Sequence, residues 1–500
     1  MSLHSAVGPR QDENSIIEDD SNMASSSERT PLLASPSNTM PSRSMQYLAA
    51  LSACTAAMAV GTTMGWTSAA EKPLTNSAIP GDYKIDSNQF SWVSAMLSIG
   101  AIVGAVPLGY LANIIGRKKV IILLAPFMSI GYLLLAFSTG FWMLLLGRFI
   151  LGGVTGAYCV VVPMYTGEIA EPAIRGVLGS FFQLLITAGI LLAYALNALN
   201  VSLLWINIVF AILPAIMAIM VLYFPDSPRW SISKGHETDA RNALKVFRGT
   251  SDVEDEIQLI KDDITREREA KLPFSQAVST TAAKKALFLA LTVMLFQQFS
   301  GINAVIFYAS QIFADAKVPL EESQCTVIVG VCQIIATYVS TLIIDRAGRK
   351  PLLISSGAIM AISGALLGLY FYLTEQTHVT DGVDISWLPI VSMVVFIILF
   401  SLGYGPIPWL YMGEVFSDQI KETGMSIATV VNWISVFIVT KFYGDLKEGI
   451  GGYGAFWVFS AISVLGCFFT FFFVLETKGK TFDQIQMELA GEKPKNLNRI

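Results

Sequence analysis

The chain has 500 residues, of which 53 % are hydrophobic and only 14 % are charged, against roughly 25 % charged in soluble domains. This composition excludes an ordinary soluble protein and indicates a polytopic membrane protein. The net charge of −5 identifies no partner, because the charges fall in loops and tails. The cysteines lie in or beside apolar stretches and the histidines are scattered, so we expect no disulfide framework, no metal site, no cofactor and no nucleic-acid partner.

Residues 1–45 are polar and Ser-rich, with no apolar run. We therefore expect a disordered cytoplasmic N-terminal tail and not a cleavable signal peptide. Within it, Glu28-Arg-Thr-Pro-Leu32-Leu33 has the form of an acidic dileucine sorting signal. Such a signal binds sorting adaptors and would direct the protein to an endosomal or lysosomal membrane. Motifs this short also arise by chance, so residence in the cell membrane is the first expectation and the intracellular membranes are the alternative.

Twelve apolar stretches follow, each long enough to cross a bilayer core, which takes roughly 20 residues of helix. Because lipid leaves no water to pair with the backbone, each stretch is predicted to be a transmembrane helix and the fold to be an all-α membrane protein. The expected spans are 47–70, 89–112, 120–138, 143–165, 177–199, 202–223, 286–309, 324–344, 352–373, 387–412, 425–443 and 454–475.

Basic residues fix the expected orientation. Arg117, Lys118 and Lys119 follow span 2, and Arg346, Arg349 and Lys350 follow span 8, whereas the alternate loops are acidic or uncharged. By the positive-inside rule both termini face the cytoplasm. The sequon Asn200-Val-Ser then lies outside, but in a turn too close to the membrane for efficient glycosylation.

The chain is duplicated. A charged linker over 224–285, partly helical in pattern, separates a first half (46–223) from a second half (286–475), and a cytoplasmic tail covers 476–500. Three motifs occur once in each half at matching places. Gly-Arg-Lys follows spans 2 and 8, a glutamate (Glu168, Glu414) closes spans 4 and 10, and a motif with an acidic residue begins after spans 6 and 12, at Pro225 and Glu476. Two parallel six-span halves predict a substrate site at their interface, reached from each side in turn, which favours a carrier over a receptor or channel.

Arginines and carboxylates recur at the cytoplasmic mouths of the spans. We expect them to form a reversible latch, with ion pairs that stabilise the state in which the inner ends of the halves lie together; the alternative is a set of solvated, unpaired positive-inside charges. The predicted latch residues are Arg117, Glu168, Arg175, Asp345, Arg346, Arg349, Glu414 and Glu476, with Asp226 and Arg229 in support. Asn113 replaces the acid found at Asp345 in the second half, so the first latch is expected to be the weaker.

The motifs taken together resemble the sugar porter family of the major facilitator superfamily, over essentially all of 46–485. They are Gly-Arg-Lys twice, Gly147-Arg148, Pro163-Met-Tyr-Thr-Gly-Glu168, Pro225-Asp-Ser-Pro-Arg229, Gln297-Gln-Phe-Ser-Gly-Ile-Asn303, Gly405-Pro-Ile-Pro-Trp409 and Glu476-Thr-Lys-Gly-Lys-Thr-Phe482. Among members the chain is most similar to insect facilitated trehalose transporters and related intracellular-type hexose facilitators. The resemblance implies the twelve-helix major facilitator fold, a bilayer environment and a small neutral sugar as substrate.

A sugar site needs amides, which both donate and accept hydrogen bonds, and an aromatic side chain to cover a ring face. The resemblance places sugar contact at motif positions of that kind: Gln183, Gln297, Gln298, Asn303, Gln333, Trp409, Asn432 and Trp433. Interhelical hydrogen bonding is the alternative role for each amide. On a straight helix Gln298 and Asn303 would point about 140° apart, but Ser300-Gly301 between them is expected to unwind the helix and let both face one site.

Two glycines and two prolines between Gly403 and Pro408 predict a broken span 10. It would act as a gate with Trp409 as its plug, and a static kink is the alternative.

No Asp, Glu, Lys or His lies near mid-membrane in the expected spans, so no group is placed to carry a driving proton. The sequence therefore predicts a facilitative uniporter for trehalose or a hexose. A proton-coupled sugar or polyol symporter and a non-transporting sugar sensor remain alternatives; an enzyme is disfavoured because no nucleophile–base set occurs.

Overall fold

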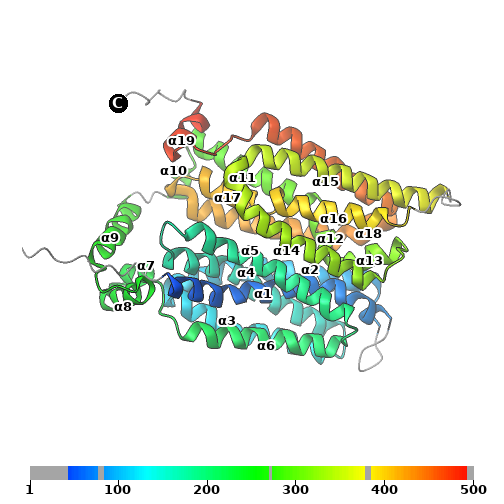
Figure 1. The fold of residues 1–500 in the computed structure, drawn as a ribbon, viewed down its shortest axis with the longest axis horizontal. Helices are drawn as coiled ribbons and strands as arrows, with labels where there is room; N and C mark the ends of the chain where they lie inside the picture. The colour runs from blue at the N-terminus through cyan, green and yellow to red at the C-terminus, as the bar shows by residue number, and fades with distance from the viewer. Residues whose placement is uncertain (1–42, 77–83, 270–272, 378–384, 492–500) are drawn as a thin grey trace, which may run out of the picture. The chain divides into compact units, whose positions relative to one another are not determined.

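A computed structural model describes residues 43–76, 84–269, 273–377 and 385–491. The sorting motif with Glu28, Leu32 and Leu33, most of the N-terminal tail and the last nine residues lie outside this described part. Six long helices form the first half (Figure 1): α1 (Ser44–Thr75), α2 (Ser87–Ile115), α3 (Arg117–Ala136), α4 (Phe141–Ile169), α5 (Arg175–Ala198) and α6 (Leu203–Leu222).

Four short helices follow between the halves: α7 (Pro228–Ser233), α8 (Glu237–Arg248), α9 (Glu254–Glu269) and α10 (Phe274–Ala277). The second half has more interruptions: α11 (Thr281–Phe299), α12 (Ile302–Phe307), α13 (Ala309–Asp315), α14 (Glu322–Ala347), α15 (Arg349–Tyr372), the π-helical turn η1 (Leu373–Thr377), α16 (Leu388–Leu399), the π-helical turn η2 (Phe400–Tyr404), α17 (Ile407–Val415) and α18 (Asp418–Phe473). The amphipathic α19 (Phe482–Ala490) ends the described chain.

The number of membrane crossings agrees with the sequence. Eleven helical segments in the described part are long and apolar enough to span a membrane, and the last of them runs from Gln419 to Phe473. Its backbone breaks at Gly451, with φ 78° and ψ 165°, so the expected spans 425–443 and 454–475 are its two arms. The all-α fold with twelve crossings in two six-helix halves is confirmed.

Glycines allow the helices of the first half to pack backbone to backbone. A Cβ atom added at Gly61 of α1 would lie 2.0 Å from the carbonyl oxygen of Ile186 in α5, and one at Gly100 of α2 would lie 2.2 Å from that of Phe149 in α4. Small residues at such crossings are the usual device for close helix contact in a membrane, where lipid removes the hydrophobic driving force.

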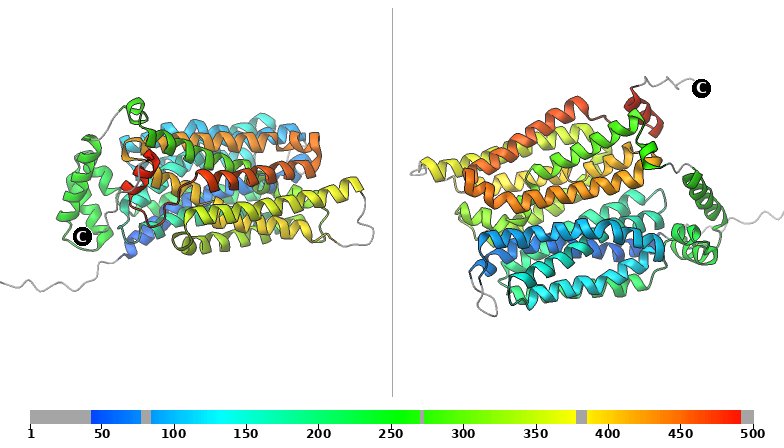
Figure 2. Two further views of the ribbon diagram at one scale, coloured as in Figure 1. Left: turned by 90° about the horizontal axis from the view of Figure 1, so that it is seen from above. Right: turned by 180° about the vertical axis from the view of Figure 1, so that it is seen from behind.

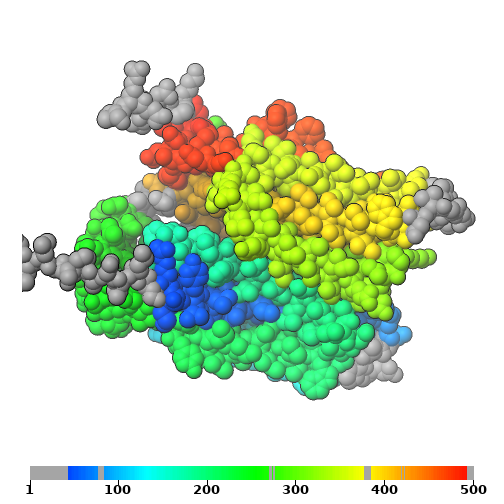
Figure 3. Space-filling model, viewed as in Figure 1, coloured from blue at the N-terminus to red at the C-terminus, as the bar shows by residue number. Residues whose placement is uncertain are grey.

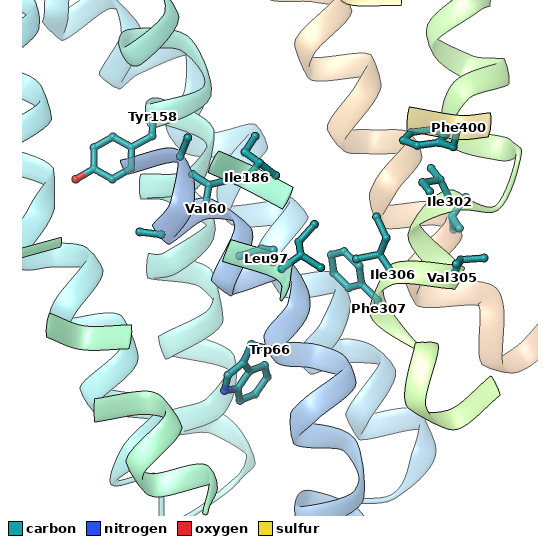
Figure 4. Packing of buried hydrophobic residues seen from close by; sticks show 14 of the residues in the cluster. Val60, Trp66, Leu97, Tyr158, Ile186, Ile302, Val305, Ile306, Phe307 and Phe400 are labelled. Carbon is teal, nitrogen blue, oxygen red and sulfur yellow. The ribbon is translucent and has the colours of Figure 1, made fainter. Parts of the chain in front are cut away.

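The two halves form separate bundles that meet along two seams (Figure 2). One seam joins α5 to α14, which lie beside each other on the face drawn in Figure 3, and the other joins α2 to α18. Apolar side chains continue across the junction. Figure 4 shows Trp66 and Leu97 of the first half on one side and Ile306 and Phe307 of the second half on the other, all within one buried cluster.

The helices α7–α9, which lie between the halves in the sequence, attach to the first half. The Gln46 amide at the start of α1 donates to the Phe247 carbonyl at 3.0 Å, and a guanidinium nitrogen of Arg248 donates to the carbonyl of Ile169 at 2.9 Å. The Trp230 indole donates to the Asn113 carbonyl at 3.1 Å. These contacts fix the charged linker to the start of α1 and to the C-terminal ends of α2 and α4.

Candidate substrate site and charge network

The seventh span unwinds where the sequence predicts it. Helix α11 ends at Phe299, Gly301 adopts the left-handed conformation at φ 91°, and α12 begins at Ile302. Glycine is needed here because a side chain disfavours that conformation. The break brings two amides together: Asn303 Nδ2 donates to Gln298 Oε1, and each residue is 7 % exposed. The expected unwound turn is confirmed and the two amides are in contact; that both face a substrate site stays a prediction.

A network of buried amides extends from this pair. Gln298 Nε2 donates to Gln297 Oε1 at 3.1 Å, and Asn432 Nδ2 of α18 donates to the same oxygen at 3.2 Å. Gln297 and Asn432 are themselves 2 % and 5 % exposed. Four of the eight predicted sugar-contact residues therefore form one connected set that bridges the seventh and eleventh spans.

The other four predicted contacts are not hydrogen-bonded to this network in the described part of the chain. Gln333 of α14 is buried, and its side-chain oxygen has no partner among described groups. Gln183 of α5 is half-buried. Trp409 of α17 is half-buried against the main core, and Trp433 is buried beside Ala101 of the first half. Gln333 thus offers a free acceptor, and the roles of the others remain predictions.

Span 10 is broken, as its glycines and prolines predict. A π-helical turn runs over Phe400–Tyr404, with the Gly405 N–H donating to the Phe400 carbonyl at 2.7 Å, and a new helix begins at Ile407. Such turns occur often at functional sites. The gating role of this segment and of Trp409 stays a prediction.

A buried arginine of the first half belongs to the motif Gly147-Arg148, to which the sequence assigned no role. Arg148 of α4 is fully buried. Its guanidinium donates to the carbonyls of Thr63 and Val93 at 2.7 and 3.1 Å and to the Thr67 hydroxyl at 3.0 Å, and it lies 4.9 Å from the Trp66 ring centre. These described partners are all neutral. An arginine inside an apolar span was the available signal, because ionisable residues at that depth are rare and functional.

At the cytoplasmic end of the second half the expected charges pair. The Arg349 guanidinium donates to Glu414 Oε1 at 2.7 and 3.1 Å and to Asp345 Oδ1 at 3.0 Å. The Thr477 hydroxyl donates to the other Glu414 oxygen at 2.5 Å. Glu476 accepts hydrogen bonds from the backbone N–H groups of Arg349 and of the following lysine, both at 3.0 Å.

The first half repeats this arrangement with fewer partners. Arg117 donates to Glu168 at 2.8 Å, while the second Glu168 oxygen and Arg117 Nε have no partner in the described part. Asp226 accepts the backbone N–H of Lys118 at 3.1 Å, as Glu476 does in the second half. Arg229 pairs elsewhere, with Glu267 of α9. We find no ion pair of Arg175 or Arg346 with another described side chain.

The carboxylates that accept backbone N–H groups sit in spaces left by glycines. A Cβ at Gly116, where φ is 109°, would lie 2.2 Å from Asp226 Oδ2, and a Cβ at Gly348, where φ is 94°, would lie 2.9 Å from Glu476 Oε2. Partial burial raises the pKa of Glu476, but backbone N–H groups from Lys478, Arg349 and others outweigh it, so the net pKa is below its usual value.

The paired latch residues lie within each half, and their role as a latch stays a prediction. Arg349–Glu414 and Arg117–Glu168 each lie within one half. The described hydrogen bonds between the halves lie at the opposite end of the helices from these ion pairs. Ser68 of α1 donates to the Ser310 hydroxyl at 2.9 Å and accepts its N–H at 3.0 Å. The outer ends of the halves are therefore held together in this arrangement.

Other contacts of this outer seam use α5, α14 and α18. The Tyr194 hydroxyl donates to the Ile306 carbonyl at 2.8 Å, and Lys441 Nζ donates to Asn88 Oδ1 at 3.1 Å. Lys72 of α1 also pairs with a carboxylate at the start of α14. Each of these bonds must break if the outer side is to open.

Comparison with known proteins accounts for both the fold and the motifs. Residues 39–489 match the family model "Sugar (and other) transporter". The facilitated trehalose transporter Tret1 of Polypedilum vanderplanki is 38 % identical over 451 residues, covering 89 % of this chain and 88 % of the relative. Tret1 of Culex quinquefasciatus is 39 % identical over 451 residues, covering 89 % of this chain and 86 % of the relative.

Solved structures support the same architecture. The xylose transporter XylE from E. coli, in a partially occluded inward open conformation, superposes with a TM-score of 0.75 at 24 % identity, covering 88 % of this chain and 100 % of that one. This likeness concerns the fold alone. Taken with the family match, the duplicated halves and the paired cytoplasmic motifs have one explanation: the chain belongs to the sugar (and other) transporter family and has the major facilitator fold.

Proposed function

We propose that this protein is a facilitative transporter, a uniporter that moves trehalose or a hexose across the membrane by alternating access. The observation that carries the proposal is the buried amide network at the break of span 7, where Gln298 and Asn303 face each other. Amides suit a polyhydroxylated, uncharged ligand, because each donates and accepts hydrogen bonds. Gln333 adds a buried acceptor without a described partner, which a sugar hydroxyl would satisfy.

Uniport is supported by the surroundings of Arg148. A proton-driven carrier needs a group that gains and loses a proton during the cycle, and a carboxylate beside a buried cation would serve. Here the described partners of Arg148 are carbonyl oxygens and the Thr67 hydroxyl, none of which titrates near neutral pH. We assign the chain no enzymatic activity, since the named relatives are transporters.

The halves 46–223 and 286–475 are proposed to rock against each other, with the linker 224–285 following the first half. The contacts that fix α7–α9 to α1, α2 and α4 support this division. The outer seam would open as the inner ends close.

A flux panel tests the proposal. Purified protein in liposomes is offered labelled trehalose, glucose, fructose and inositol, with and without an imposed proton gradient. We expect at least one of the three sugars, trehalose, glucose or fructose, to equilibrate without accumulation and without response to the proton gradient. Accumulation that a protonophore abolishes would establish symport instead. Binding without flux would indicate a sensor, and a preference for inositol a polyol carrier.

The site has its own test. Gln298→Ala and Asn303→Ala should each weaken sugar binding by roughly one to two orders of magnitude, because an unsatisfied hydroxyl in a desolvated site costs about 1–3 kcal/mol. Gln311→Ala is the control, since this amide lies on α13 outside the network and contacts Asp315. If the two variants melt at lower temperature but bind sugar normally, the amides only hold helices together and the proposed site is wrong.

The membrane of residence is proposed to be the cell membrane, with an endosomal or lysosomal membrane as the alternative. Glu28, Leu32 and Leu33 would bind sorting adaptors in the second case, although they lie outside the described residues. Replacing both leucines by alanine should raise the surface-labelled fraction if the motif is read. An unchanged distribution would leave the cell membrane as the residence without adaptor sorting.

A further inference from the structure

A buried lysine lies in the seam that α18 forms with α2. Lys441 is only 5 % exposed, although it stands in a helix that is long and apolar enough to span the membrane. A buried ammonium group is costly unless it has partners. Asp445, one turn further along α18, lies 3.7 Å away with a side chain that is 56 % exposed. This distance is too long for a hydrogen bond, so the closer partners of the ammonium group decide how it is held.

Those closer partners belong to the other half of the protein. Lys441 Nζ donates to Asn88 Oδ1 of α2 at 3.1 Å and lies 5.2 Å from the ring centre of Trp92. The centre of the Trp92 ring also lies 6.2 Å from that of Phe437. The two α2 residues are one helical turn apart, and so are the two α18 residues, so the pairs face each other across the seam. We call these four residues the α2–α18 clamp.

Movement of the halves would remove these partners but not Asp445. Asn88 and Trp92 lie near the start of α2, at the end opposite Arg117, whereas Asp445 travels with Lys441 on α18. The hydrogen bond to a charged group and the ring face are therefore gained only when this end is closed. Because Trp92 is 38 % exposed, the clamp lies at the rim of the seam. The ammonium group thus gives up only part of its hydration on closing.

A second charged contact crosses this end but depends less on closure. Lys72 of α1 pairs with Glu322 of α14, and the lysine side chain is 72 % exposed. Exposed ion pairs contribute little, since water solvates both charges whether or not they are paired. The buried lysine of the α2–α18 clamp is the better candidate for a charge whose surroundings change when the halves move.

We propose that Lys441 is a gating residue. Its ammonium group holds α18 against α2 and so stabilises the arrangement in which the ends of the halves opposite the Arg349–Glu414 pair are closed. The inference rests on the proposed function, because opening and closing of this end matter only to a carrier that works by alternating access. It gives a role to a residue outside both the proposed sugar site and the latch motifs.

Labelling of an introduced cysteine tests the clamp without sugar. Ser68 is 2 % exposed and contacts Ser310 of the second half, so Ser68→Cys, the parent, should react with a membrane-impermeant maleimide only when this end opens. Peptide-resolved mass spectrometry separates this site from the native cysteines. In proteoliposomes, Lys441→Met should raise the labelling rate of the parent about tenfold, because the open state becomes more populated. Lys441→Arg should stay within about threefold of the parent, since a guanidinium can donate to Asn88 and stack on Trp92.

Lys261→Met is the control for removal of a lysine charge. Lys261 pairs with Glu237 in the linker helices at 2.7 Å, so its replacement leaves the seam untouched and should not change the labelling rate. Trp92→Leu should raise labelling less in the Lys441→Met background than in the parent, because the ring then has no cation to bind.

The same shift should appear as an asymmetry of transport. The apparent affinity for a ligand scales with the fraction of protein in the state that binds it. In oriented proteoliposomes, Lys441→Met should therefore lower the half-saturation concentration for sugar offered on the side of the clamp, but not for sugar offered on the side of Arg349. Loss of folded protein alone would lower the maximal flux and leave both half-saturation concentrations unchanged.

Two results would overturn the gating role. Labelling of Lys441→Met at or below the parent rate would show that the ammonium group does not favour closure. Labelling of Lys441→Arg as fast as that of Lys441→Met would show that the positive charge is not what holds the seam. Absence of transport in the flux panel is a different result: it refutes the proposed function, whereas the labelling rates, measured without sugar, still judge the clamp.

Discussion

Arg349 holds the cytoplasmic end of the second half, and its removal should destabilise the protein measurably. The residue is 8 % exposed and bonds twice to Glu414, whose side chain is 23 % exposed, and once to Asp345, whose side chain is 78 % exposed. Stranding a buried partner costs about 3–5 kcal/mol, and partial exposure of Glu414 places the expected cost near the lower limit. The exposed Asp345 pair adds at most about 1 kcal/mol.

The assay is a double-mutant cycle on purified protein, read by thermal unfolding and by flux. Arg349→Ala should leave membrane insertion intact, lower the melting temperature and slow transport. The further change Glu414→Ala should cost little in that background, because no stranded carboxylate remains. Arg346→Ala is the control, as this neighbour has no described ion pair. If the costs of the two single substitutions simply add, or if flux stays at wild-type level, the charge pair does not work as reasoned here.

Three shorter predictions follow from the geometry. Gly301→Ala should lower the melting temperature, because the left-handed backbone costs about 1–2 kcal/mol with a side chain and the new Cβ would lie 2.6 Å from the Phe459 ring. Adding Phe459→Ala should recover part of this loss. No recovery would show that the clash with the ring is unimportant. Arg148→Met should express poorly or melt early, because buried carbonyls lose their donors at about 1–3 kcal/mol each; normal stability would show that water replaces the guanidinium. Because the pKa of Glu476 is lowered in the folded protein, the ionised carboxylate stabilises the fold above the ordinary pKa of 4.5, and this stabilisation is lost as the pH falls through the lowered pKa. Between about pH 6 and 3 the melting temperature of Glu476→Gln should therefore fall less steeply than that of the wild type. Parallel curves would contradict the lowered pKa.

The sequence was sufficient for features that depend on one segment at a time. Apolar length located the spans, and Ser300-Gly301 located the break in span 7, because glycine frees the local backbone. The prolines at 406 and 408 likewise located the break in span 10. Each of these features is set by local chemistry that requires no knowledge of neighbouring helices.

The partners across helices could not be read from the sequence. That Gln297 faces the Tyr404 carbonyl depends on the register between spans 7 and 10, which no local pattern encodes. The same holds for Ser340, an unremarkable serine until the carbonyl of Leu402 is found beside it. Arg148 was overlooked for another reason: its partners are backbone carbonyls, so no acidic residue elsewhere in the chain signals its environment.

The two glycines that directly precede α3 and α15 limit which substitutions the chain can accept. Gly116 and Gly348 combine φ of 109° and 94° with ψ of 154° and 158°, a region essentially closed to other residues. At both sites a carboxylate oxygen also occupies the place of the missing side chain. Each position is thus restricted twice, by backbone and by space, and removing the carboxylate relieves only one restriction. In a library of all single substitutions, we expect these two positions to be depleted alike, and no change at Asp226 or Glu476 to restore them.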